Sequence, residues 1–237
     1  MKFNEFPKMA RLSRECVVTE KIDGTNASVL ICKEIRDYDK NLLIASFADT
    51  MVFAGSRTRY VTPSDDNFGW AAWVKEHAEE LTELGEGQHF GEWWGKGIQR
   101  NYGLAERRFS LFNTLRWTKG DPIEIKPTNP KDKPKLIVNP PACCDVVPTL
   151  YKGDFNTNEI EHCLYILKTE GSLAAPGFMN PEGVVVYHVA GNVGFKKTLG
   201  GDGAKGANRG GLYHSELGII FGISRSRVTT ILGMKAR

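Results

Sequence analysis

The succession of strand-like and helix-like segments constrains the fold of this 237-residue chain more than any other feature. Residues 15–35 contain two apolar runs, "ECVVTEKI" and "ASVLICKEI", and the Asp-Gly pair between them predicts two strands joined by a tight turn. Further strands are predicted in "LLIASFADTMVFAGSRTRYV", "QHFGEWWG", "RRFSLFNTLRW", "EGVVVYHV" and "NVGFKKTL", and helices in "SDDNFGWAAWVKEHAEEL", starting at Ser64 or Asp65, and in "TNEIEHCLYILKTEG". Strand pairs interrupted by helices, without regular strand–helix–strand alternation, predict an α+β domain of antiparallel sheets with flanking helices.

The remaining segments divide the chain into a main domain and a tail. Six of the eleven prolines lie between residues 119 and 141, together with several lysines, so this stretch is predicted to be an irregular surface insertion. After Leu199 the sequence "GGDGAKGANRGG" is typical of a flexible connector. We therefore expect a main domain at residues 1–199, a glycine-rich linker at 200–212 and a helical tail at 213–237.

The tail carries most of the positive charge. From Lys205 to Arg237 there are six Lys and Arg residues against one acid, Glu216, which gives +5 and leaves +3 − 5 = −2 for the rest of the chain. The segment "ELGIIFGISRSRVTTIL" resembles a helix-turn-helix, with Arg225 and Arg227 at the start of the second helix, where such motifs contact nucleic acid. A two-helix cap packed on the main domain is the equal alternative. In either case a polyanion is the expected partner.

Composition argues against several classes of protein. No apolar run approaches the roughly 18 residues of a membrane span, and the first 15 residues contain no signal-peptide block, so a cytoplasmic location is expected. The five cysteines form an odd set without a CxxC spacing, which predicts reduced, structural thiols and no zinc site. The five histidines likewise form no ligand-like cluster in the sequence.

Lys21 is the unusual residue of the first strand. It lies in an apolar run and directly precedes "DGTN", so its amine is expected at a sheet surface that faces a cleft. Taken alone, such a lysine most often extends its amine to solvent. Its neighbours in the sequence change that interpretation. They are "EKIDGTN" around Lys21, "GSRTR" with Arg57, "FGEWWG" with Glu92, "FSLFNT" with Phe112, "PEGVVVYH" with Glu182, and "GFKKTL" with Lys196 and Lys197.

These six segments, in this order, resemble the motifs of the lysine nucleotidyltransferases, the family of ATP-dependent DNA ligases, RNA ligases and mRNA capping enzymes. They cover residues 20–198, so residues 1–199 are interpreted as an adenylyltransferase domain. The resemblance implies the cofactors ATP and Mg²⁺, with Mn²⁺ as a substitute. It implies catalytic roles for Lys21, Arg57, Glu182, Lys196 and Lys197, ATP contacts from Glu20, Lys21, Ile22, Asn26, Arg57, Glu92, Phe112, Glu182 and Lys196, and metal contacts from Glu182 and Glu92.

The chemistry of lysine adenylation fits the same residue types. An amine that attacks the α-phosphorus of ATP must be neutral, and nearby cations and partial desolvation favour the neutral form. Arginine, lysine and a metal ion can neutralise the phosphate oxygens, and Mg²⁺ prefers oxygen ligands such as Glu182. By the resemblance, Glu92 also holds the ribose hydroxyls, and Glu20 or the backbone beside it reads the adenine edge.

Three assignments stay open at this point. Phe109, Trp93 and Trp94 compete with Phe112 for the role of stacking on adenine. Family members usually have two lysines separated by one residue in the last motif, whereas Lys196 and Lys197 are adjacent here, so only one can point directly into the cleft unless the strand is bulged. We favour Lys196, with Thr198 in the second inward place. Arg59 is predicted to contact nucleic acid, and Lys96 is a weaker candidate for a phosphate contact.

The segment after Thr198 separates the members of the family. DNA ligases and capping enzymes carry an OB-fold there, and the 39 residues after Thr198 read as a linker and two short helices. This favours an ATP-dependent RNA ligase. Its expected substrate is RNA, or an RNA/DNA hybrid or DNA, with 5′-phosphate and 3′-hydroxyl ends. The protein is expected to be a monomer that does not bind a membrane. The alternatives are a DNA ligase or nick sealer without an OB domain, and a non-catalytic nucleic-acid-binding regulator with a ligase-like domain.

Overall fold

The structure is a computed structural model that describes residues 9–33, 39–125 and 134–200. The chain divides into two units, Met1–Leu199 and Gly200–Arg237. All elements described below belong to the first unit. The predicted linker after Gly200 and the predicted helix-turn-helix with Arg225 and Arg227 lie outside the described residues.

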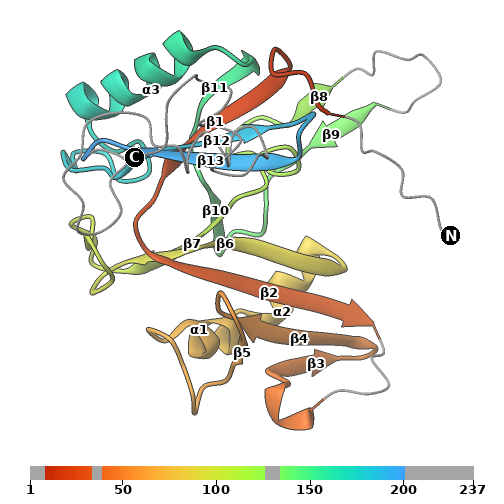
Figure 1. Cartoon of the computed structure of the whole chain (residues 1–237). Coiled ribbons are helices and arrows are strands. Elements are labelled where there is room, and N and C mark those ends of the chain that lie inside the picture. The colour runs from red at the N-terminus through yellow and green to blue at the C-terminus, as the bar shows by residue number, and fades with distance from the viewer. Residues whose placement is uncertain (1–8, 34–38, 126–133, 201–237) are drawn as a thin grey trace, which may run out of the picture. The chain divides into compact units, whose positions relative to one another are not determined.

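The first of the two large sheets has four strands and is covered by a helix. Its strand order is β11-β1-β12-β13, and every neighbouring pair is antiparallel (Figure 1). The strands are β1 (Glu15–Lys21), β11 (Thr149–Asp154), β12 (Gly183–His188) and β13 (Val193–Thr198). The covering helix, α3 (Thr157–Glu170), packs its buried side chains against the first sheet in a core that includes Val18, Leu167 and Val184.

The second sheet has seven strands. Its order is β10-β7-β6-β2-β4-β3, and β5 also pairs with β4. The strands are β2 (Thr25–Lys33), β3 (Ala45–Phe47), β4 (Thr50–Gly55), β5 (Tyr60–Val61), β6 (Gly87–Gly95), β7 (Arg107–Leu111) and β10 (Cys144–Val146). One face packs against α1 (Trp70–Glu76) and α2 (Ala78–Leu81) in a core that includes Trp70, Trp93 and Phe109. All pairs except β7–β10 are antiparallel, so the α+β prediction is confirmed.

The predicted hairpin between β1 and β2 is wrong. β1 pairs with β11 and β12 in the first sheet, and β2 pairs with β4 and β6 in the second, so the Asp23–Gly24 link crosses from one sheet to the other (Figure 1). The Asp-Gly signal reports a local preference for a turn. Here both edges of each strand are occupied by strands distant in the sequence, and that pairing determines the outcome.

A small apolar cluster joins the two sheets beside this link. It consists of Ile22, Trp94, Tyr102, Val147 and Ala175, each at most 4% exposed. Ile22 comes from the link itself and Trp94 from β6. The end of β1, which carries Lys21, is therefore fixed against the second sheet.

Three other segments differ from the sequence prediction. The helix predicted to start at Ser64 or Asp65 begins at Trp70, because the Asp66 carboxylate accepts hydrogen bonds from the backbone amides of Ala71 and Ala72 at 2.7 and 3.0 Å. The proline-rich insertion contains a two-stranded sheet of β8 (Ile123–Ile125) and β9 (Lys135–Ile137). Short 3₁₀ helices at Lys40–Leu42 and Thr82–Leu84 complete the set.

No helix in the described part of the chain is long and apolar enough to cross a membrane.

Candidate active site

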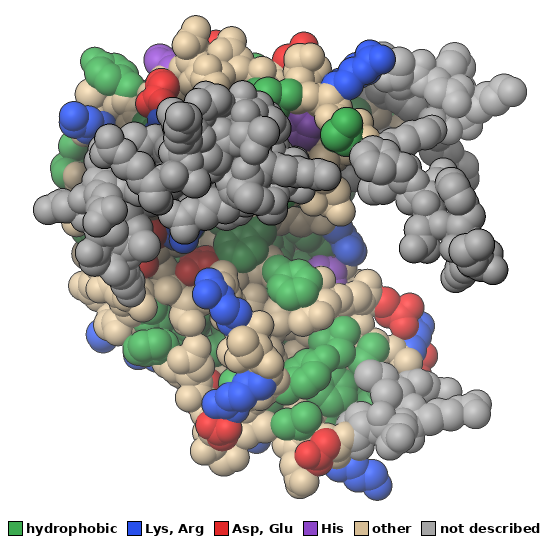
Figure 2. Space-filling model, in the orientation of Figure 1, with side chains coloured by type: hydrophobic (Ala, Val, Ile, Leu, Met, Phe, Trp, Pro, Cys, Tyr) green, Lys and Arg blue, Asp and Glu red, His purple; other side chains and the backbone are tan. Residues whose placement is uncertain are grey.

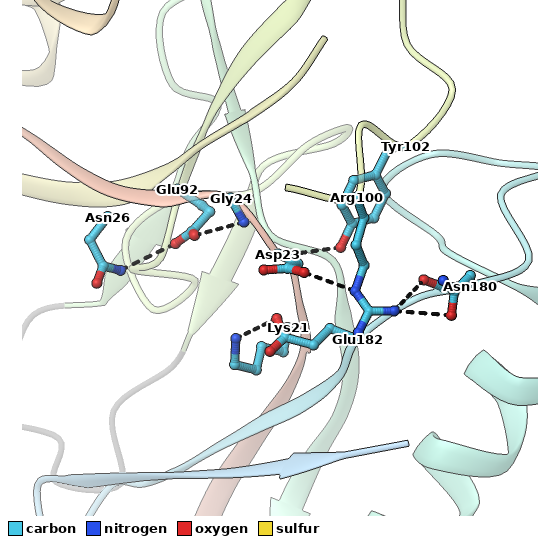
Figure 3. A network of polar contacts seen from close by, with 9 residues as sticks. All are labelled: Lys21, Asp23, Gly24, Asn26, Glu92, Arg100, Tyr102, Asn180 and Glu182. Atoms are coloured by element: carbon cyan, nitrogen blue, oxygen red, sulfur yellow. Dashed lines mark hydrogen bonds and ion pairs between the residues drawn. The ribbon is translucent and has the colours of Figure 1, made fainter. Parts of the chain in front are cut away.

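Lys21 ends β1 and forms an ion pair with Glu182. Its Nζ lies 2.5 Å from Glu182 Oε2 (Figure 3). The contact follows from the strand register, since Lys21 pairs with Gly183 at the start of β12 and Glu182 directly precedes that strand. The two side chains are 23% and 17% exposed. The pair is therefore sheltered but still reachable by a solute.

Glu92 on β6 holds the link between the sheets. Its carboxylate accepts hydrogen bonds from the Gly24 amide at 3.0 Å and from the Asn26 side-chain amide at 3.2 Å (Figure 3). Gly24 must be glycine, because a Cβ atom there would lie 2.5 Å from the Trp93 carbonyl oxygen. Burial raises the pKa of Glu92 to about 7, against the lowering effects of the Gly24 hydrogen bond and the Lys21 charge. Lys21 and Glu92 therefore act on each other electrostatically.

Arg57, in the turn between β4 and β5, contacts one of the residues around Glu92. Its Nε donates to Asn26 Oδ1 at 2.7 Å, so Asn26 connects Arg57 to Glu92. A pocket of about 290 Å³ opens here, lined by Thr25, Ser56, Arg57, Arg59, Val61, Asp66 and Asn67. Arg59 lines the pocket but gives both terminal nitrogens to Asp65, at 2.5 and 3.0 Å. Arg57 is the arginine of the two without an ion pair among the described residues.

A group of side chains that the sequence analysis missed surrounds Asp23. Arg100 donates from Nε to Asp23 at 2.9 Å and from Nη1 to the backbone and side-chain oxygens of Asn180, both at 3.0 Å (Figure 3). The Tyr102 hydroxyl accepts a hydrogen bond from the Asp23 amide at 2.7 Å. Arg100 thus ties the link after Lys21 to the segment that carries Glu182. No motif signalled this role, because it depends on a contact across 77 residues.

The loop that carries Arg100 has an unusual backbone. Gln99, Asn101 and Tyr102 have φ angles of 44°, 61° and 50°, in the left-handed region that is costly for residues other than glycine. Strained backbone of this kind persists where the surrounding contacts determine it, and it clusters at functional sites. Its position beside the Lys21–Glu182 pair strengthens the assignment of this region as the active site.

The comparison with known protein families matches this picture. The family model described as RNA ligase matches residues 14–199, which contain all the site residues described above in this section. The chain belongs to the RNA ligase family.

Two solved structures of RNA ligases from Naegleria gruberi are similar to the chain. One is a mutant in the apo form, with 19% identity and a TM-score of 0.47, and the match covers 78% of this chain and 50% of that one. The other is a mutant with ATP and Mn, with 17% identity and a TM-score of 0.45, covering 78% and 48% of the two chains. This chain therefore spans about half the length of the RNA ligases whose structures it matches.

The strand register places the two lysines of the last motif on opposite faces of the first sheet. Lys197 forms an ion pair with Glu161 of α3 and pairs with Val184, which is buried beneath that helix. Lys196 pairs with Val185 and therefore lies on the other face, the one that carries Lys21. Thr198 lies on the Lys196 face as well.

Glu20 points away from Lys21. It lies on the α3 side of β1, where its carboxylate accepts hydrogen bonds from the Ser172 hydroxyl at 2.6 Å and from the Leu173 and Ala174 amides at 2.8 and 2.9 Å. Burial raises the pKa of Glu20, and these three hydrogen bonds oppose the rise. The side chain holds the loop after α3. The sequence analysis left open whether the Glu20 side chain or the backbone beside it contacts adenine. Because the side chain is used here, we keep the backbone as the prediction.

The three aromatic competitors of Phe112 are buried. Phe109, Trp93 and Trp94 are at most 2% exposed and belong to apolar cores, whereas Phe112 is 41% exposed. Phe112 follows β7 two residues after Ser110, which lies opposite Glu92, so Phe112 and Glu92 share one face of the second sheet. Lys96 follows β6 and accepts a hydrogen bond from Arg107 through its carbonyl oxygen.

The oxygen donors of the site suit a divalent cation of the magnesium type. Glu182 uses one carboxylate oxygen for Lys21, and no hydrogen bond to its other oxygen is present among the described residues. Glu92 uses both oxygens within the protein. Glu182 is therefore the better donor of the two predicted metal ligands.

A second group of donor atoms in the described part of the chain includes none of these residues. His77, Glu80 and Cys143 bring one ligand atom each to within 4.8 Å of one another. His77 Nδ1 is 3.7 Å from Glu80 Oε2, and the other Glu80 oxygen accepts the Cys143 amide at 2.7 Å. The sequence analysis saw no such cluster, because its members are up to 66 residues apart and no local spacing connects them.

Proposed function

We propose that the protein is an ATP-dependent RNA ligase that works through a lysyl-AMP intermediate. The observation that carries the proposal is the convergence of Lys21, Glu182, Glu92 and Arg57 in a chain of the RNA ligase family. Three of these groups come from strand ends or a turn of two different sheets, and a purely structural role would not require a partly exposed lysine among them.

In the first step the Lys21 amine attacks the α-phosphorus of ATP. A nitrogen–phosphorus bond forms, the bond between the α-phosphorus and the bridging oxygen breaks, and pyrophosphate leaves. The amine must lose a proton and leave the contact with Glu182 before it can attack. Arg57 and Lys196 would neutralise charge on the phosphate oxygens, and such stabilisation carries most of the catalysis in phosphoryl transfer.

Glu182 would hold a Mg²⁺ or Mn²⁺ ion through its carboxylate, directly or through water. When bound, the ion supplies positive charge to the phosphates of ATP and orients the leaving group. The solved relative in complex with ATP and Mn is consistent with this pair of ligands. Glu182 thus has two uses in the proposal, as the partner of Lys21 before the reaction and as a metal ligand during it.

The second sheet would bind the nucleoside. The carboxylate of Glu92 and the amide of Asn26 are fixed side by side, and they offer an acceptor and a donor for the ribose hydroxyls. Phe112 is exposed on the same face and offers a ring on which adenine can stack. The bound base would lie over the second sheet with its phosphates toward Lys21.

In the following steps the AMP moves from Lys21 to the 5′-phosphate of a nucleic acid, which forms a pyrophosphate linkage. A 3′-hydroxyl then attacks the 5′-phosphorus, a phosphodiester forms and AMP leaves. The family makes RNA the expected substrate. The predicted basic tail would add phosphate contacts that are sensitive to salt.

A panel of nicked duplexes tests the proposal. Each substrate carries one 5′-phosphate and one 3′-hydroxyl, and the strand that supplies the 3′ end is RNA, DNA, or DNA with a single terminal ribose. An RNA ligase seals the first and third substrates faster than the second, because recognition then uses the 2′-hydroxyl. Faster sealing of the DNA nick would make the protein a DNA ligase. Failure to seal any of them, together with tight nucleic-acid binding, would favour a non-catalytic regulator.

A further inference from the structure

A row of residues crosses the second sheet beside the proposed ATP site. The Phe112 amide donates to the Phe90 carbonyl at 3.0 Å, Phe90 lies opposite Ser28, Ser28 opposite Gly55, and Gly55 opposite Tyr60. Directly opposite residues of neighbouring strands share a face of the sheet, so all five lie on one face. The three aromatic members are exposed by 41% at Phe112, 55% at Phe90 and 37% at Tyr60.

This face is the one that carries the nucleotide-binding residues. Glu92 lies two residues after Phe90 on β6, and Asn26 two residues before Ser28 on β2, a step of about 6.7 Å along a strand. The opposite face is closed by the core around Trp70 and Phe109. The row therefore continues the face of the proposed ATP site, with its three aromatic rings exposed and with Ser28 and Gly55 buried between Phe90 and Tyr60.

The two residues in the row between the rings of Phe90 and Tyr60 have small side chains or none. Ser28 and Gly55 separate Phe90 from Tyr60, and a Cβ atom on Gly55 would lie 2.5 Å from the Ser28 hydroxyl, so no larger residue fits there. Phe90 and Tyr60 stand three strand spacings apart, about 14 Å. At that distance the two rings cannot stack on the same base. The Tyr60 ring rests on the buried Phe53 ring, with centroids 5.9 Å apart, which limits its freedom.

Polar and charged groups surround the rings. Gln88 donates to the Ser28 hydroxyl at 3.1 Å, and Arg57 lies in the short turn that joins β4 to Tyr60. In Figure 2 hydrophobic side chains gather over β2 and β4 on the visible face, next to Lys and Arg side chains. Separate exposed rings with a cation beside them suit unstacked bases and their phosphates better than a continuous apolar protein surface does.

We propose that this row, through Phe90 and Tyr60, binds unstacked bases of the RNA strand that the enzyme seals. The inference rests on the proposed function, because it places the substrate beside the AMP carried by Lys21. Stacking on aromatic rings tolerates any base, so the row would bind single-stranded RNA without sequence specificity. Phe112 would remain the platform for adenine, and Phe90, next to it, would receive the first substrate base.

The test measures binding of a fluorescently labelled single-stranded oligouridylate to the full chain by anisotropy, without ATP. Phe90→Ala and Tyr60→Ala are each expected to raise the Kd about 5- to 150-fold, the range that base stacking supports. The slope of log Kd against log salt concentration should stay the same, because the phosphate contacts remain. Phe90→Trp and Tyr60→Phe keep a ring and should bind within a few fold of the wild type.

Two controls separate stacking from a general loss of structure. Tyr165→Ala removes a ring that is 63% exposed on α3, in the other sheet's layer, and should leave the Kd unchanged. An oligonucleotide of the same length with abasic riboses should bind the wild type and Phe90→Ala equally. Wild-type affinity of both alanine variants for oligouridylate, or equal weakening for the abasic strand, would overturn the proposal.

The proposed function fails by a different observation. If the wild type forms no lysyl-AMP but the ring variants lose RNA affinity as expected, the ligase proposal falls and the base-binding row stands. If the wild type forms lysyl-AMP and seals RNA while both ring variants bind oligouridylate normally, the ligase proposal stands and the row is refuted. In that case a protein segment becomes the better candidate for this surface.

Discussion

The two large sheets contribute to the site in different ways. The first sheet presents charged side chains at or near strand ends, namely Lys21, Glu182 and Lys196, and the side chains of the Lys21–Glu182 pair are partly exposed. The second sheet presents Glu92 and Asn26, which are bound to each other, and Glu92 also to the backbone of the link. In the proposed function, the groups that change partner or protonation during adenylation, Lys21 and Glu182, thus lie on the first sheet, and two groups that contact the nucleoside, Glu92 and Asn26, are held in place by the second.

This comparison predicts two kinds of mutant. Substitutions on the first sheet should lower kcat, because they remove interactions made in the transition state. Substitutions of Glu92 and Asn26 on the second sheet should mainly raise KM for ATP, because their contacts are the same in the ground state and in the transition state. The expected effects follow from the largest to the smallest.

Lys21→Ala should abolish sealing of an RNA nick, with a loss on the order of 10³-fold or more, because the proposed nucleophile is gone. Lys21→Arg should be equally inactive, since a guanidinium stays protonated. Both variants should still seal a nick whose 5′-phosphate already carries AMP, since that step needs no lysyl-AMP. A Lys21→Ala enzyme that seals the ordinary substrate from ATP would remove the lysine from the mechanism.

Glu182→Gln should lower kcat for adenylation about 100-fold, because it removes a charge that pairs with the Lys21 amine and that is proposed to hold the metal. Glu161→Gln is the matched control. That carboxylate also forms an ion pair with a lysine of the first sheet, Lys197, but on the α3 face. We expect near wild-type rates for Glu161→Gln, and comparable losses in the two variants would contradict the assignment of faces.

Arg100→Ala should lower kcat for adenylation about 10-fold while KM for ATP changes little. Arg100 is a positioning residue that ties Asp23 to Asn180, and small displacements of reacting groups are costly. Arg100→Lys should recover only part of the activity, because one ammonium cannot reproduce the contacts of the guanidinium. A rise in KM with unchanged kcat would assign Arg100 to ATP binding.

Glu92→Gln should weaken ATP binding about 10-fold and remove its pH dependence. The Glu92 carboxyl has a raised pKa of about 7, so the ionised acceptor forms as the pH rises through 7, and wild-type affinity should increase over that range. The measurement is calorimetric titration with an α,β-methylene analogue of ATP, which cannot be transferred. Pairing it with the 2′-deoxy analogue should show the same loss in the wild type and little further loss in the variant.

The same group affects stability in the opposite direction. Between about pH 4.5 and 7 the folded protein holds a proton on Glu92 that the unfolded chain has released. Its contribution to stability is therefore complete below pH 4.5 and is lost as the pH rises to 7. Thermal unfolding of the ATP-free protein should show a Tm that falls over this range, and less steeply in Glu92→Gln. Equal slopes would show that Glu92 titrates normally.

The sequence predicted the elements whose pattern is local. The helix at Thr157–Glu170 and the strands at Gly87–Gly95, Gly183–His188 and Val193–Thr198 were recognisable from apolar periodicity and end signals. β10 and β11 were missed, because one has three residues and the other is half-exposed along its length. The partners of β1 could not be predicted, since strand pairing is decided by contacts distant in the sequence.

For the candidate site, the residue types were easier to predict than their orientations. Motif order led to Lys21, Glu92 and Glu182, which the fold brings together. It could not show that the Glu20 side chain points to the loop after α3, because that orientation depends on which face of β1 packs against α3. Arg100 was missed for the same reason, since its two partners come from distant segments.

The most direct test of this account is to locate the AMP. The full chain is incubated with ATP and Mg²⁺ without RNA, digested under alkaline conditions that preserve a phosphoramidate, and analysed by mass spectrometry. We predict one AMP adduct, on the Lys21 amine, that is lost in acid. An adduct on another residue, or a folded protein that takes up no AMP across a range of pH values and metal ions, would contradict the assignment of Lys21 as the nucleophile.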